Sequence, residues 1–131
     1  MNIKFLKAFN GDSIWVSFLD SEEIPRNILI DGGVGNCFKS ISNVKGQLFE
    51  VINKIRENNQ YIDLLVLTHF DDDHIGGILR WLNKDKDASK LIKKVWFNSG
   101  KEIAKKFESD ENKDLNIEII DESNDFQTSP K

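Results

Sequence analysis

The chain has 131 residues, a formal net charge of −4 and an isoelectric point near 5.2. This length supports one domain with a single moderate core, and the acidic balance excludes a global basic field for nucleic acid. Its longest uncharged apolar run is too short to span a bilayer, and no signal-peptide pattern opens it, so we expect a cytoplasmic protein with no membrane partner. The single cysteine, Cys37, excludes an intrachain disulfide and a cysteine-type zinc site. We expect it to be a small buried side chain.

The first nineteen residues predict a β-hairpin. Residues 3–9 alternate imperfectly between apolar and polar, residues 10–12 read Asn-Gly-Asp, and residues 13–19 return to a β pattern. We interpret Asp12 as a turn carboxylate that caps its own backbone, with an approach to the rim of an active site as the alternative.

A strand, a helix and a second strand follow. Residues 27–30 predict a strand that stops at Asp31 and a glycine-rich turn, which matches neither the dinucleotide fingerprint nor the P-loop. Apolar residues from Ile41 to Asn59 recur at helical spacing, and residues 62–67 are nearly continuously hydrophobic. Such a unit is right-handed and presents ligands at the carboxyl ends of its strands.

The segment after the second of these strands carries the metal-binding chemistry. Both histidines of the chain, His69 and His74, lie there, with Asp71, Asp72 and Asp73 between them. Three like charges on a short loop are unfavourable unless a cation neutralises them, so the sequence predicts a bound metal. If the loop is extended, His69, Asp71 and Asp73 share a face, and His74 joins from the turn into the next helix.

Two alternatives compete with a transition-metal loop. An acidic surface loop could hold two incidental histidines, because motif matches carry false positives. A calcium loop fits less well, since imidazole is a poor calcium ligand and the alternation required by an EF-hand is missing. Gly76 and Gly77 would let the next helix start close to the loop.

The remainder predicts further helices and strands. Ile75, Ile78, Leu79 and Leu82 form the stripe of a helix that ends in the polar loop 83–87, with Trp81 off the stripe and exposed at the rim. Later elements are a strand at 93–97 followed by a turn at Asn98 and Ser99, a short helix around 103–107, a last strand at 115–120 and a polar tail at 121–131. The three tryptophans are interpreted as core or edge residues, with base stacking as the alternative.

Residues 68–77, Thr-His-Phe-Asp-Asp-Asp-His-Ile-Gly-Gly, resemble the signature of the metallo-β-lactamase fold, His-x-His-x-Asp-His followed by Gly-Gly. Asp71 stands where most members have the second histidine. That variant is similar to the one in the metallo-β-lactamase-like domains of bacterial DNA-uptake competence proteins. The resemblance implies a divalent metal, with up to two ions in a complete domain. Zinc is the expected ion, and manganese or iron compete better here because a carboxylate hardens the site.

The resemblance also implies a role for each matching residue. His69 and Asp71 would bind a first ion, and Asp73 and His74 a second. Asp73 is the expected catalytic residue, because it would also orient the metal-bound water. Asp31 resembles a strand-end aspartate that supports the metal loop without binding the ion. The residues expected to support or border the site are Asp31, Thr68, Asp12, Gly76 and Gly77.

The fold implied by the resemblance is α/β, half of a metallo-β-lactamase-type αββα sandwich, with a mixed β-sheet and helices packed on one face. Residues 1–131 would form a single, incomplete domain. A complete member supplies further histidines and a bridging aspartate from its later half, whereas no histidine follows His74. Asp121 or Asp125 could replace a later carboxylate, although their spacing does not support it.

The implied activity is metal-dependent hydrolysis, in which a metal-bound hydroxide attacks an ester or a phosphodiester, nucleic acid included. The alternative is a non-catalytic, truncated metal-binding or protein-interaction module that needs a missing half or a partner. In that case an exposed apolar sheet face would favour a homodimer or a completing subunit.

Overall fold

A computed structural model describes residues 1–9, 11–69, 71–97 and 117–119, the last three by their backbone alone. The helices and strands in chain order are β1 (Asn2–Phe5), β2 (Ile14–Leu19), β3 (Pro25–Ile30), the 3-10 turn η1 (Gly35–Cys37), α1 (Gln47–Glu57), β4 (Leu64–Leu67), α2 (Asp72–Lys84), α3 (Ala88–Leu91), β5 (Val95–Phe97) and β6 (Ile117–Ile119).

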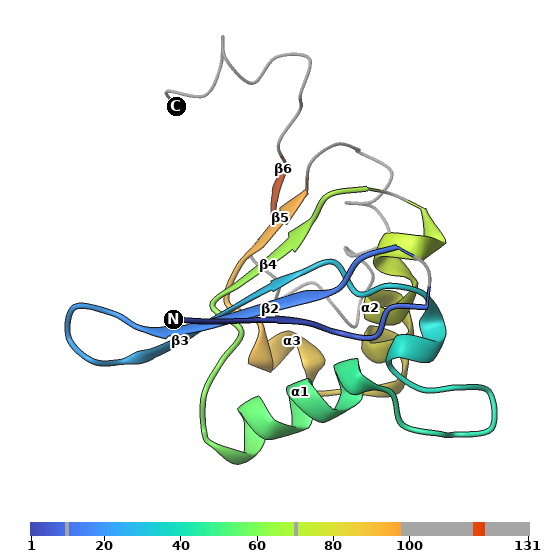
Figure 1. Cartoon of the computed structure of the whole chain (residues 1–131), viewed down its shortest axis with the longest axis horizontal. Helices are drawn as coiled ribbons and strands as arrows, with labels where there is room; N and C mark the ends of the chain where they lie inside the picture. Colours follow the sequence, from blue (N-terminus) through green and yellow to red (C-terminus); the bar gives the residue numbers. More distant parts are fainter. Residues whose placement is uncertain (10, 70, 98–116, 120–131) are drawn as a thin grey trace, which may run out of the picture.

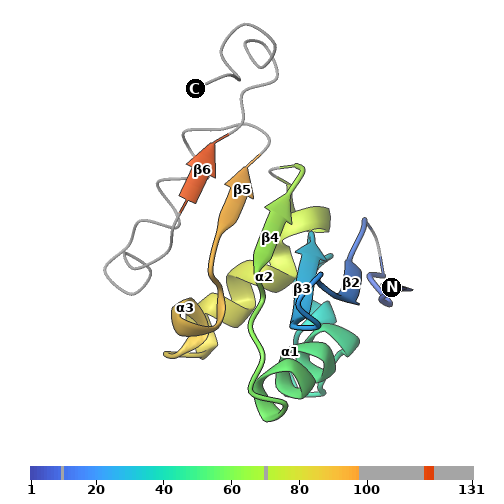
Figure 2. The same cartoon turned by 90° about the vertical axis from the view of Figure 1, so that its left-hand side faces the viewer.

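The strands form one mixed sheet in the order β1-β2-β3-β4-β5-β6. Strands β1 to β3 pair antiparallel, and β3 to β6 pair parallel, so their arrows point the same way in Figure 2. Helix α1 crosses from β3 to β4, and α2 with α3 crosses from β4 to β5. The helices lie on the same face of the sheet (Figure 1). This is the predicted α/β architecture.

The core lies between that face and the helices. Alternate strand residues such as Leu29, Leu65 and Phe97 are buried there, while the strand residues that directly precede them are only half-buried. The predicted amphipathic stripe of α1 supplies the opposing layer with Leu48, Val51, Ile52 and Ile55. Cys37 is fully buried in this cluster, which confirms the prediction of a small buried side chain.

Trp81 corrects one prediction, because it is fully buried instead of exposed at a rim. It lies three residues after Ile78, on the buried side of α2. Its indole Nε1 donates a 3.0 Å hydrogen bond to Asp85 Oδ2, which allows the ring to be buried without an unpaired donor.

The start of α1 corrects a second prediction. Helical spacing was expected from Ile41, yet the helix begins at Gln47, and Ile41 and Val44 are 94% and 66% exposed. Residues 39–45 form a loop closed by a bridge between Lys39 and Lys45. The Ser40 hydroxyl accepts a 3.0 Å hydrogen bond from the Val44 N–H, a side-chain contact that competes with helix formation.

Other boundaries differ by a few residues. Ile62 forms an isolated bridge with Ile92, and the strand proper starts at Leu64. Helix α3 was not predicted. Three of its four residues, Ala88, Ser89 and Leu91, are buried. The turn at Asn98 and Ser99, the helix near 103–107, Asp121 and Asp125 lie outside the described residues. Within the described part of the chain, no helix has both the length and the apolarity needed to cross a membrane.

Candidate metal centre

The predicted metal loop lies at the edge of the sheet where the parallel strands end. Asp31 directly follows β3, and Thr68 and His69 directly follow β4. Asp71 is the N-cap of α2, and His74 lies in the first turn of that helix. Neighbouring parallel strands have their carboxyl ends at one edge, so these residues are brought together by the strand order.

Asp31 is a buried carboxylate held by one partner. It is 1% exposed, and its backbone has a positive φ of 59°. Its Oδ1 accepts a 2.8 Å hydrogen bond from the Thr68 N–H, and its Oδ2 accepts a short one from the Thr68 hydroxyl. Burial raises the pKa of Asp31, and the two hydrogen bonds from Thr68 oppose that rise. The carboxylate therefore ties the end of β3 to the start of the metal loop.

The Thr68 hydroxyl also contacts His69. Its Oγ1 lies 2.9 Å from Nδ1 of His69. A hydroxyl has one proton, and here it is donated to Asp31, so the same oxygen accepts from the Nδ1–H of His69. This assignment from the hydrogen-bond network leaves the lone pair of Nε2 available to a metal.

His74 is surrounded by carboxylates. Its Nδ1 lies 2.5 Å from Asp71 Oδ1, and its Nε2 lies 3.6 Å from Asp12 Oδ2. The hydrogen bond to Asp71 is the main cause that raises the pKa of His74, and it lowers the pKa of Asp71. The imidazole rings of His74 and His69 are 4.5 Å apart between centroids. Both histidines therefore share one small region.

The extended geometry expected through Asp73 is wrong from Asp72 onward. Helix α2 begins at Asp72, because the Asp71 carbonyl accepts the N–H groups of His74 and Ile75 at 3.0 Å each. Carboxylates favour the first turn of a helix, where the backbone N–H groups are unpaired and the dipole is positive. Asp72 and Asp73 are consequently helical, and the proposed ligand and catalytic role of Asp73 stays a prediction.

Among the described residues, one group of potential ligands is compact enough for a metal ion. Asp12, Asp31 and His74 each offer a ligand atom, and these atoms lie within 4.8 Å of one another. Two ligand atoms on one ion, each at about 2.1 Å, lie roughly 3.4 Å apart at a tetrahedral angle. The 3.6 Å separation of His74 Nε2 and Asp12 Oδ2 is close to that value. The donor set of carboxylate and imidazole fits a divalent ion.

Asp12 is therefore more central than the sequence predicted. The expected capping of its own backbone is absent among the described residues; the carboxylate faces His74, and the carbonyl accepts the Gly33 N–H at 2.9 Å. No local sequence signal singled Asp12 out, because only the pairing of the hairpin with β3 brings its carboxylate to His74. His69, Asp71 and Asp73 are not in the compact group, and their roles as ligands remain predictions.

Glycines allow the close contact between the loop after β3 and α2. The Gly32 N–H donates to the His74 carbonyl at 2.6 Å, and the Gly77 N–H donates to the Gly33 carbonyl at 2.9 Å. A Cβ atom on Gly77 would collide with the Gly32 carbonyl, whereas one on Gly76 would lie 3.0 Å from the Gly35 nitrogen. This packing fixes the position of His74 relative to the loop that begins at Asp31.

Comparison with known proteins gave one family. The family model of the metallo-beta-lactamase superfamily matches residues 12–129. The match spans Asp12, Asp31 and the whole of the predicted metal loop. No curated protein matches the chain.

Proposed function

The chain belongs to the metallo-beta-lactamase superfamily, and we propose that it is a metal-dependent hydrolase acting on an ester or a phosphodiester, nucleic acid included. The observation that carries the proposal is the position of His74, whose Nε2 faces Asp12 while Asp71 holds its Nδ1. A metal-binding histidine usually donates one ring N–H to a carboxylate and binds the ion through its other nitrogen, which then lies near the other ligand atoms of that ion.

Each residue contributes through a defined atom. Thr68 orients His69 so that Nε2 is free, and Asp71 does the same for His74. Asp12 adds an exposed carboxylate from the hairpin turn. We assign Asp73 to orienting the attacking water. A divalent cation bound here would lower the pKa of a coordinated water and neutralise charge that develops on the substrate.

We propose zinc as the ion, with manganese or iron as alternatives. The carboxylates outnumber the imidazoles around the site, and hard oxygen ligands reduce the preference for zinc over manganese. The choice of a phosphodiester rests on the likeness of the loop to that of the competence proteins, since the same fold hosts many substrates. We further propose a cytoplasmic location. The single cysteine is a free thiol, the form that cysteines keep in a reducing compartment.

Metal content per chain tests the proposal. Protein purified without chelator is measured by inductively coupled plasma mass spectrometry, beside a His69→Ala/His74→Ala double variant and an Asp87→Asn control. Asp87 is an exposed carboxylate before α3, outside the metal loop. We expect about one or more ions per chain in the wild type and the control and none in the double variant. A wild type free of metal would rule out catalysis by this chain alone.

Hydrolysis of a chromogenic phosphodiester and of a chromogenic carboxylic ester then separates the two substrate classes. We expect faster turnover of the phosphodiester, loss on adding chelator, and recovery on adding manganese or zinc. Activity that persists in the double variant would come from a contaminant and would contradict the assignment.

A second candidate function is a non-catalytic metal-binding or interaction module completed by a second copy or another subunit. It is favoured by the sheet face opposite the helices, where Phe5, Ile14, Ile30 and Val66 pair across four neighbouring strands. These side chains are half-buried or, for Phe5, 74% exposed. Apolar surface of this kind favours association.

Sedimentation velocity over a range of concentrations tests the second candidate. We expect concentration-dependent dimerisation that Phe5→Lys weakens. Ile41→Lys is the matched control, because Ile41 is 94% exposed in the loop before α1, on a different part of the chain. A wild type that stays monomeric throughout would exclude the homodimer.

A further inference from the structure

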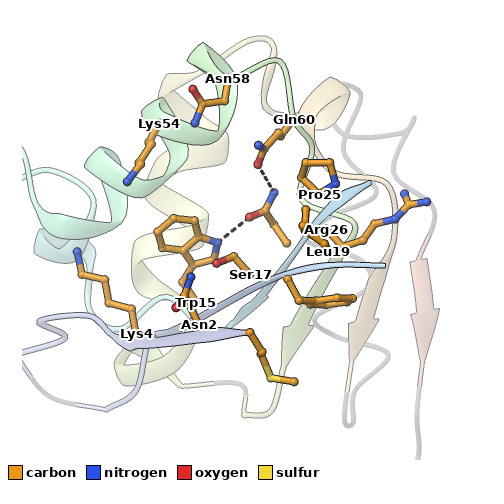
Figure 3. A pocket seen from close by; sticks show the side chains of 13 residues that line it. Asn2, Lys4, Trp15, Ser17, Leu19, Pro25, Arg26, Lys54, Asn58 and Gln60 are labelled. Carbon is orange, nitrogen blue, oxygen red and sulfur yellow. Dashed lines mark hydrogen bonds between the residues drawn. The ribbon is translucent and has the colours of Figure 1, made fainter. Parts of the chain in front are cut away.

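A cavity lies away from the metal loop. It has a volume of about 560 Å³ and lies between α1 and the helix-facing side of β1, β2 and β3 (Figure 3). Asn27, in its wall, lies on β3 four residues before Asp31, which follows that strand, and four extended residues span about 13 Å. Its volume falls in the range of roughly 300–1,000 Å³ in which proteins hold small molecules.

The wall of this cavity contains a fixed aromatic ring. Trp15 donates from Nε1 to Asn27 Oδ1 at 2.9 Å, and Asn27 is itself 1% exposed. The Asn27 amide nitrogen donates to Gln60 Oε1 at 3.1 Å and to the Tyr61 carbonyl at 2.9 Å. The edge of the indole is thereby held by a buried network, and the ring would lose little conformational entropy on binding a ligand.

The charged side chains that line the cavity are all cationic. Among the lining residues that the structure describes, they are Lys4, Arg26 and Lys54, with no carboxylate. Arg26 is already paired, at 3.0 Å to both Asp20 and Asp63. Among the described residues, Lys4 and Lys54 have no carboxylate partner. Two ammonium groups that no described carboxylate neutralises, in a protein of net charge −4, concentrate positive charge at this cavity.

Lys54 is directed at the cavity although partners on its own helix were within reach. Glu50 and Glu57 are four residues before and three residues after it, spacings at which ion pairs form on a helix. Its Nζ instead lies 5.9 Å from the centroid of the Trp15 ring, and Figure 3 shows the side chain extending from α1 toward that ring. Glu57 accepts a hydrogen bond from Asn53 at 3.1 Å.

We propose that this cavity binds a small organic anion with a planar ring, of the nucleoside monophosphate class. Lys4 and Lys54 would contact the anionic group, and the face of Trp15 would contact the ring. Stacking on tryptophan accepts any base, and ammonium groups bind phosphate as point charges. The site is separate from the metal loop and does not depend on the hydrolase proposal.

Nuclear magnetic resonance of the indole N–H signals tests the proposal. The full chain, freed of metal by chelator, is titrated with adenosine monophosphate, adenosine and inorganic phosphate. Trp15→Phe assigns the Trp15 signal among the three tryptophans. We expect adenosine monophosphate to shift the Trp15 signal saturably at millimolar concentration or below, with weaker binding of adenosine and of phosphate alone.

A charge variant decides whether the cavity is the site. Lys54→Gln should weaken binding of adenosine monophosphate about tenfold, whereas Lys86→Gln, an exposed lysine between α2 and α3, should leave it unchanged. No shift of the Trp15 signal, or equal affinity in Lys54→Gln and wild type, would overturn the proposal. Phosphate binding as tightly as the nucleotide would overturn the contribution of the ring. Unchanged signals of the other two tryptophans show that the variants are folded.

Discussion

The two oxygens of the Asp31 carboxylate both accept hydrogen bonds from Thr68, the residue directly before the predicted ligand His69. An unpaired carboxylate oxygen in a buried position is costly, because the lost hydrogen bond is not replaced by water. The same hydroxyl contacts His69, so a change at Thr68 affects the stability of the fold and the orientation of one predicted ligand.

We therefore expect Thr68→Val to lower the free energy of unfolding by about 1–3 kcal/mol, measured by urea denaturation. Valine matches threonine in shape but removes the hydroxyl. Thr68→Ser is the control, since it keeps the hydroxyl and removes only a methyl group. Equal stabilities of the valine and serine variants would show that the hydrogen bond to Asp31 contributes nothing.

His74 makes stability depend on pH in the metal-free protein. Its pKa is raised above the ordinary value of 6.5, chiefly by Asp71, whose own pKa is lowered so that it stays ionised. The folded state thus holds the proton more tightly than the unfolded state, and the resulting stabilisation is present in full below the unfolded pKa. It is lost as pH rises through the folded pKa.

Urea denaturation with chelator present, from about pH 6 to about pH 8, should show unfolding free energy falling as pH rises. His74→Gln should flatten that slope, since glutamine does not titrate. A slope that is the same in both proteins would assign the pH dependence to other groups.

Cys37 is predicted to be chemically inert while the protein is folded. Burial raises the pKa of its thiol to about 11, and Sγ donates to the Lys7 carbonyl at 3.2 Å. Because the thiolate is the reactive form, a disulfide reagent at neutral pH should react with the unfolded chain at once and with the folded chain only as fast as it opens. Rapid labelling of the folded protein would contradict the burial of Cys37.

At the level of elements, periodicity predicted which faces are buried better than where elements begin. The stripe of Leu48, Val51, Ile52 and Ile55 was predicted and is buried. The same spacing included Ile41 and Val44, which belong to a loop. Hydrophobic periodicity cannot detect that the Ser40 hydroxyl accepts a hydrogen bond from the backbone, which competes with helix formation. The start of α2 at Asp72 was missed for a related reason, since acidic residues suit both a metal loop and a first helical turn.

The contact between α2 and the loop after β3 gives a prediction at this scale. A Cβ on Gly77 would collide with the Gly32 carbonyl, which is backbone and cannot rotate away. Gly77→Ala should therefore lower unfolding free energy by about 1–3 kcal/mol even though alanine is the better helix former. Gly76→Ala is the matched control: its Cβ would lie 3.0 Å from its nearest neighbour, so we expect a much smaller loss. Thermal denaturation of the two variants side by side measures the difference.

For the molecule as a whole, the site was predictable where its residues are adjacent in sequence and less so where the sheet assembles it. His69, Asp71 and His74 come from one short segment, so the sequence alone was enough to predict that they lie close together. Asp12 comes from a hairpin turn more than fifty residues earlier, and only the pairing of β2 with β3 and of β3 with β4 places it beside His74. The sequence favoured a carboxylate that caps its own backbone, with the rim of the site as the alternative, because nothing local distinguishes Asp12 from an ordinary turn aspartate.

This assembly couples metal binding to the stability of the entire fold. Asp12, Asp31 and His74 belong to three different parts of the chain, and their ligand atoms meet only when the sheet is formed. An ion that binds the folded state alone, at about one hundred times its dissociation constant, stabilises that state by about 2.7 kcal/mol. We expect manganese or zinc to raise the melting temperature of the metal-free protein by several degrees, and chelator to reverse the rise.

Single variants identify the ligands behind this rise. His74→Ala should abolish it, and Asp87→Asn should retain it. Asp12→Asn distinguishes the compact group from the ligands predicted by the sequence. A rise that disappears in Asp12→Asn makes the hairpin turn part of the metal site. A rise that persists in Asp12→Asn but disappears in His69→Ala assigns the ion to the loop after β4. A wild type whose melting temperature is unchanged by either metal would contradict the coupling and, with it, a metal site built by these residues.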